Sequence, residues 1–136
     1  MDIELISDTM DKNKREIDIV NIQFIALILT LVTTFISVII TYNQKRELKG
    51  KDPMFTGKQI YNITLFNRIF ILALSFAFLY VNYNLYQISK EEGEDLKPYE
   101  LQLLASVLVI ISGLIALYVV SLSNTESIAD VENPII

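Results

Sequence analysis

The residues best placed to do chemistry lie in one apolar segment, residues 60–87 (IYNITLFNRIFILALSFAFLYVNYNLYQ). Arg68, Ser75 and Asn82 recur there at intervals of seven residues, which places them on one face of a helix, in the pattern of a packing seam. Such a face could line a pore, where a ring of arginines would favour anions, or it could bond to a neighbouring helix. We interpret the face as turned toward protein, because Arg68 and Asn82 would be costly against lipid.

Arg68 is the one charged residue within this segment. A group of tyrosines that includes Tyr80 and Tyr86 is typical of the opposite membrane interface, about 20–26 Å away along a helix. This spacing favours a shallow position for Arg68, so we predict that its guanidinium snorkels to the nearer interface on its aliphatic stem. The alternative is a buried Arg68, which then requires a partner.

Other kinds of site are poorly supported. The chain has no Cys and no His, which removes thiolate chemistry, imidazole bases, disulfides and most transition-metal sites. The run TGKQ at residues 56–59 is not a phosphate-binding loop, because Asp52 replaces the upstream glycine and Gln59 replaces Ser or Thr. The acidic segment SKEEGEDLK at residues 89–97 matches no calcium-binding loop. We therefore predict no catalytic residues, no metal and no cofactor, and we expect that the protein is not an enzyme.

Three apolar segments must position these residues, at about 19–42, 60–87 and 99–122. A membrane core of about 30 Å requires roughly 20 helical residues, and each segment is long enough. The chain has 136 residues, 52% of them hydrophobic, and a mean hydropathy of +0.43, so little length remains for a soluble domain. The sequence predicts an all-α integral membrane protein, with residues 1–136 forming a single membrane domain.

The segments before and after the spans are polar. An amphipathic helix is predicted to lead into the first span, either as a simple extension or as a docking helix for a partner. Its apolar residues recur at helical spacing: Ile3, Ile6, Met10, Ile17 and Val20. The tail, residues 123–136 (SNTESIADVENPII), is predicted to be disordered.

The first and third spans also carry faces of small or hydroxyl residues, which allow close approach between helices. We interpret both faces as packing seams or surfaces for a partner, and a polar pore lining is the alternative for the first. The residues are Thr30, Thr34 and Ser37 in the first span, with Gln23 and Thr41 on the same face, and Ser112, Gly113 and Ala116 in the third.

Charge predicts the orientation of the chain. The loop between the first two spans, residues 43–59, is the most basic segment, and short basic loops favour the cytoplasmic side. We therefore expect the N-terminus and the acidic loop outside, with the basic loop and the C-terminus in the cytoplasm. No basic stripe of the kind that binds nucleic acid is present. Residue usage rich in Ile, Asn and Lys suits an AT-rich bacterial or viral genome.

The function that these features favour is that of a small structural or accessory membrane subunit that acts through helix association. Its expected partners are the lipid bilayer and either a second copy or another membrane protein. The alternative is an oligomeric pore or membrane-permeabilising protein. In this respect the chain resembles holins, although only in size and number of spans. Holins commonly end in a basic cytoplasmic tail, whereas this tail has no Lys or Arg.

Overall fold

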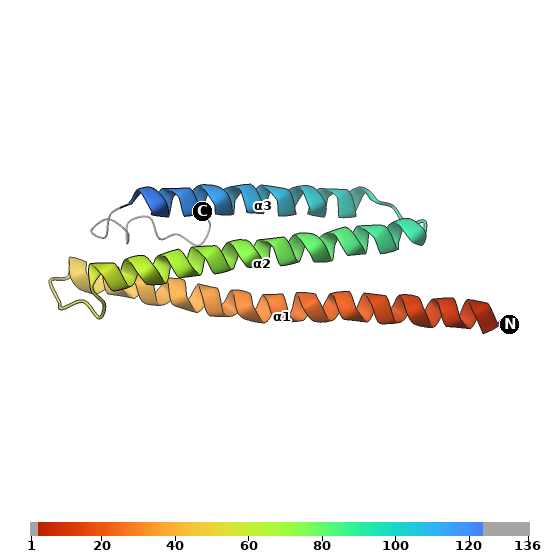
Figure 1. Cartoon of the computed structure of the whole chain (residues 1–136), viewed down its shortest axis with the longest axis horizontal. Coiled ribbons are helices and arrows are strands. Elements are labelled where there is room, and N and C mark those ends of the chain that lie inside the picture. Colours follow the sequence, from red (N-terminus) through yellow and green to blue (C-terminus); the bar gives the residue numbers. More distant parts are fainter. Residues whose placement is uncertain (1–2, 124–136) are drawn as a thin grey trace.

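Three long helices make up the computed structural model of the chain, which describes residues 3–123. They are α1 (Ile3–Leu48), α2 (Gly57–Glu91) and α3 (Lys97–Leu122), and they run up, down and up (Figure 1). Each is long and apolar enough to cross a membrane. The predicted all-α fold with three membrane-spanning helices is confirmed. The tail predicted to be disordered lies outside the described residues from position 124 onward.

The amphipathic lead-in and the first span form one continuous helix, α1, of 46 residues. It contains neither Gly nor Pro, the residues that most often interrupt or kink a helix. At about 1.5 Å per residue it is about 69 Å long, and its N-terminal end extends beyond the turn between α2 and α3 (Figure 1). The lead-in is therefore a rigid extension of the span.

The first loop is held by local hydrogen bonds. α1 ends at Leu48, and Gly50 takes a positive φ of 72° that reverses the chain. α2 then begins with a capping box, in which the Gln59 amide N–H donates to Thr56 Oγ1 (3.2 Å) and the Thr56 N–H donates to Gln59 Oε1 (2.9 Å). The run TGKQ therefore starts a helix.

The side chain of Asn43 ties this loop to α1. Its Oδ1 atom accepts hydrogen bonds from the backbone N–H groups of Met54 (2.8 Å) and Phe55 (3.1 Å), and the residue is buried. The second turn is simpler: Gly93 has a φ of 72°, and Pro98 lies in the first turn of α3.

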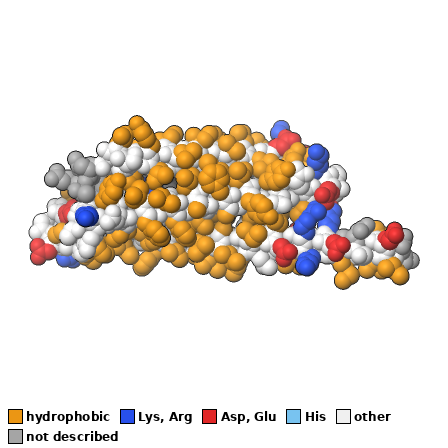
Figure 2. All heavy atoms as spheres, in the orientation of Figure 1, with side chains coloured by type: hydrophobic (Ala, Val, Ile, Leu, Met, Phe, Trp, Pro, Cys, Tyr) orange, Lys and Arg blue, Asp and Glu red, His pale blue; other side chains and the backbone are white. Residues whose placement is uncertain are grey.

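α2 is the central helix. It packs against both α1 and α3, whereas α1 and α3 make no close backbone approach to each other within residues 3–123. A small buried cluster of Ile40, Ile60 and Val120 takes one side chain from each helix. Most of the remaining apolar side chains point outward and cover the middle of the molecule (Figure 2). Such a surface is suited to contact with lipid tails.

Candidate functional site

Polar side chains on α2 reach to both neighbouring helices. Toward α1, Asn67 Nδ2 donates a buried hydrogen bond to Ser37 Oγ at 3.0 Å. Toward α3, Asn82 Nδ2 donates to Ser106 Oγ at 2.6 Å. These two amide–hydroxyl pairs lie within apolar segments, where polar groups rarely remain without a reason. We call these four residues, together with Arg68 and Ser75 from the intervening part of α2, the α2 polar seam: Ser37, Asn67, Arg68, Ser75, Asn82 and Ser106.

Arg68 lies inside the protein, with 3% of its surface exposed. A snorkelling arginine extends its guanidinium along the protein surface to water, which requires exposure. The prediction that Arg68 snorkels is therefore wrong, and the structure corresponds to the buried alternative. The tyrosine spacing was a poor guide here because it measures only depth along the helix, whereas burial depends on which face the neighbouring helices cover.

Two polar atoms next to Arg68 are buried without a hydrogen bond. Thr64 Oγ1 and Asn67 Oδ1 both belong to side chains with no exposed surface. A buried acceptor or hydroxyl without a partner costs about 1–3 kcal/mol relative to water. The α1–α2 end of the seam is thus polar beyond what its hydrogen bonds satisfy.

The hydroxyl residues predicted on the first span behave differently from one another. Thr30 donates to the Ala26 carbonyl (2.8 Å) and Thr34 to the Thr30 carbonyl (3.0 Å), so both satisfy their own helix. Ser37 is the member of this set that reaches α2. The seam on α1 therefore depends on one predicted residue.

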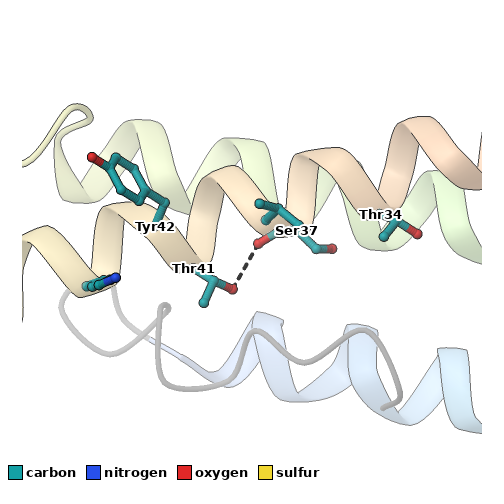
Figure 3. A pocket seen from close by; sticks show the side chains of 6 residues that line it. Thr34, Ser37, Thr41 and Tyr42 are labelled. Atoms are coloured by element: carbon teal, nitrogen blue, oxygen red, sulfur yellow. Dashed lines mark hydrogen bonds between the residues drawn. The ribbon is translucent and has the colours of Figure 1, made fainter.

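A shallow hollow of about 330 Å³ lies beside this part of α1 (Figure 3). Thr34 and Thr41 point into the space in front of the helix, and the Thr41 hydroxyl donates to the Ser37 carbonyl at 2.9 Å. Tyr42 extends to the other side of the ribbon (Figure 3). The hollow is mostly apolar, and the hydroxyls of Thr34 and Thr41 donate to the backbone of their own helix.

A second hollow, of about 320 Å³, lies where all three helices contribute side chains. Gln23 of α1, Ser75 and Asn82 of α2, and Gln102 and Ser106 of α3 supply its polar lining. Ser75 is buried and donates to the Ile71 carbonyl at 2.9 Å. The structure thus brings Gln23, predicted on the first span, together with Ser75 and Asn82, predicted on one face of the second.

The small residues predicted on the third span face α2. Ala116 is buried, and a Cβ atom added at Gly113 would lie 3.2 Å from Leu72 Cδ1, while Ser112 is half-buried. Close packing here needs small side chains. These residues therefore serve contact within the chain, and any role toward a partner remains a prediction.

Two ion pairs that were not predicted from the sequence connect α1 to the second turn. Lys12 Nζ lies 2.8 Å from Glu92 Oε1, and Arg15 Nη2 lies 2.6 Å from Glu91 Oε2. Both pairs are exposed enough to contribute little stability individually. The opposite charges of the lead-in and the acidic loop were the features that could have predicted them.

The acidic loop also contains two carboxyl groups, those of Glu92 and Glu94, that share a side-chain hydrogen bond. The pKa of Glu92 lies below its ordinary value. The larger cause is a side-chain hydrogen bond with Glu94, and the next is the hydrogen bond with Lys12. The same bond with Glu92 raises the pKa of Glu94. Within residues 3–123, no group of three or more acidic side chains is arranged to hold a metal ion.

Comparison with known proteins gives no family for this chain. No family model, no curated protein and no solved structure matches it. Its function must therefore be argued from its own residues.

Proposed function

We propose that this protein is a non-enzymatic structural or accessory membrane subunit that acts through helix–helix association. The observation that carries the proposal is the α2 polar seam, in which Asn67 and Asn82 bond to hydroxyls on two different helices. Interhelical hydrogen bonds and close packing drive association within a membrane, where lipid is as apolar as the helices. The polar residues are thus used to hold helices together.

The alternative is an oligomeric pore, which requires polar side chains that face water. The hydroxyls of Thr30, Thr34 and Ser75 donate to their own helices, and Ser37 and Ser106 accept from α2. This pattern favours the structural role, because few polar groups remain to line a channel.

For orientation in the membrane we propose that the N-terminus and the acidic loop are outside and that the basic loop and the C-terminus are cytoplasmic, in a bacterial or viral membrane. The ion pairs of Lys12 and Arg15 support placing the N-terminal part of α1 and the acidic loop on the same side, since they join the two. The excess of Lys and Arg in residues 43–59 supports placing the basic loop in the cytoplasm.

Orientation is tested with single cysteines, since the native chain has none. Gly50 and Gly93 have positive φ angles that disfavour Cys, so the cysteines are placed instead at Asp11, Lys51, Asp95 and Thr125. An impermeant thiol reagent applied to intact cells should label positions 11 and 95 and should leave 51 and 125 protected. The opposite labelling would reverse the proposed orientation.

The structural role is tested with the purified full-length protein in planar bilayers and by crosslinking in its membrane. We expect no current above background from the wild type, from Asn82→Asp in the seam, or from the control Asn84→Asp, whose amide donates to its own helix at the Tyr80 carbonyl. We expect crosslinking to give a complex of defined stoichiometry. A reproducible current that changes with Asn82→Asp but not with Asn84→Asp would establish the pore instead.

A further inference from the structure

The N-terminal end of α1 projects beyond the rest of the molecule and is apolar on one side. Lys12 and Arg15 contact the turn between α2 and α3, so the helix N-terminal to them has no neighbour within residues 3–123. This projecting part is about 13 Å long. Figure 2 shows hydrophobic side chains along the lower edge of the projection, away from the lipid-facing middle. Apolar side chains that lie outside the core and beyond the apolar middle of the molecule indicate an interaction surface.

The exposed side chains on this side follow a heptad pattern. Ile3, Met10 and Ile17 are seven residues apart, and Ile6 and Asn13 occupy the intervening positions. This is the a and d spacing of a two-stranded coiled coil. Ile3 is 82% exposed and Met10 is 65% exposed, so the stripe is unoccupied in the single chain.

The shape of the surface also fits a helix. In coiled-coil packing, a side chain of one helix enters a hole between residues i, i+3, i+4 and i+7 of the other. A hollow of about 390 Å³ on α1 is lined by residues with this spacing, namely Asn13, Glu16, Ile17 and Val20, together with Asn21. A further hollow of about 250 Å³ lies between two and three turns nearer the N-terminus, among Leu5, Ile6, Thr9 and Met10.

We propose that residues 3–20 of α1, which include the projecting end, pair in parallel with the same segment of a second copy of this chain. The inference rests on the proposed role in helix association and names its partner. Two copies inserted in one membrane with the same orientation present their α1 helices in parallel, related by a two-fold axis. Each then supplies an equally long helix that leaves the membrane at the same level.

The stripe is compatible with its own copy. No charged residue occupies the a and d positions from Ile3 to Val20, so no like charges meet at the axis. Lys12 and Arg15 are held by the acidic turn and do not face this side. In a parallel pair Glu16 lies opposite Asn21 of the second copy and so does not meet its own equivalent. A single polar core residue, Asn13, suits a register-fixing pair of asparagines.

The arrangement is tested by disulfide crosslinking of the full-length protein in its membrane. Met10→Cys places a thiol at the proposed axis, and Asp11→Cys is a matched control on the next residue, which points well away from the stripe. With a mild oxidant we expect the dimer from Met10→Cys to exceed that from Asp11→Cys several-fold. Equal crosslinking at both positions, or none at Met10→Cys, would overturn the proposal.

A second pair of variants separates association from folding. Met10→Asp should lower the dimer fraction measured by light scattering in detergent, and Asn13→Leu should raise it, because Leu at d strengthens a coiled coil. A variant that merely misfolds does not gain dimer, so an unchanged or lower fraction with Asn13→Leu would contradict the pairing. If either test of α1 pairing fails and the bilayers show no current, the pairing is wrong and the structural role stands. A current that changes with Asn82→Asp would overturn the structural role and would leave the pairing of α1 standing.

Discussion

The two interfaces of α2 are built in different ways. Against α1 the contact is polar: Thr33 of α1 and Asn67 of α2 are buried, and Asn67 bonds to Ser37. Against α3 the contact depends on small residues, with Gly113 against Leu72 and Ala116 buried. Since lipid offers little hydrophobic driving force for association, each interface needs a substitute. Buried polar groups predominate at the first interface, and close approach of small residues predominates at the second, where Asn82 also bonds to Ser106.

The largest expected effect is steric and falls on the α2–α3 interface. Ala116→Ile adds three carbon atoms at a site that is 3% exposed, which should destabilise the fold by about 1–3 kcal/mol. Ile115→Phe, at a neighbouring position that faces outward, is the control and should change little. Unfolding by SDS, followed by circular dichroism, measures both. Equal effects would mean that α3 does not pack closely against α2.

Loss of the buried hydroxyl of Thr64, near the N-terminal end of α2, should act in the opposite direction. Thr64→Val keeps the shape of the side chain and removes a buried hydroxyl that makes no hydrogen bond. We expect a gain of about 1 kcal/mol in the free energy of unfolding, the lower end of the usual desolvation penalty. The same SDS titration measures it. Destabilisation by Thr64→Val would show that the hydroxyl is satisfied in the membrane.

Hydrogen bonding at the two interfaces can be compared by double-mutant cycles. Ser37→Ala with Asn67→Ala reports on the α1–α2 pair, and Asn82→Ala with Ser106→Ala on the α2–α3 pair. Interhelical hydrogen bonds in membranes average about 0.6 kcal/mol and reach about 1.7 kcal/mol. We expect both coupling energies in this range and favourable. A coupling energy of zero in either cycle would remove that bond from the seam.

The smallest effect is expected at the ion pairs and depends on pH. Because the pKa of Glu92 is lowered in the folded chain, its contribution is present above the ordinary Glu pKa and is lost as pH falls through the lowered value. The raised pKa of Glu94 acts oppositely, since folding favours its protonated form and its contribution declines as pH rises.

The measurement is the difference in unfolding temperature between the wild type and Lys12→Gln. This difference should be small and constant near neutral pH and should disappear once Glu92 is protonated. Glu94→Gln is the control, because it removes the carboxyl group that shares a hydrogen bond with Glu92 but keeps the pairing of Glu92 with Lys12. A difference that grows on acidification would contradict the assigned direction.

The sequence predicted the helices well and the packing only in part. Hydropathy and length determine a membrane-spanning helix almost alone, which is why all three spans were foreseen. Seven-residue spacing correctly grouped Arg68, Ser75 and Asn82 on one face. Residue spacing could not predict that Thr30 and Thr34 would bond to their own helix. In any span a hydroxyl can donate either to its own helix backbone or to a neighbouring helix.

The contacts that were missed join residues far apart in the chain. Asn67 bonds to Ser37, thirty positions away, but was not predicted as a site residue. It belongs to no regularly spaced set of polar residues, so the sequence pattern did not indicate it. The hydrogen bonds that the Asn43 side chain accepts from the loop backbone were missed for the same reason. Burial of Arg68 likewise depends on where the other helices lie.

The unbroken course of α1 makes it a stiff lever across the membrane. A helix without Gly or Pro has no ready hinge, so a displacement at one end must reach the other. Over a length of about 69 Å, a tilt of 5° moves one end by roughly 6 Å relative to the other. Whatever holds the Ile3 end therefore sets the angle at which Ser37 and Asn43 meet α2 and the basic loop. A movement of α1 on one side of the bilayer is thus transmitted to the other side by a single helix.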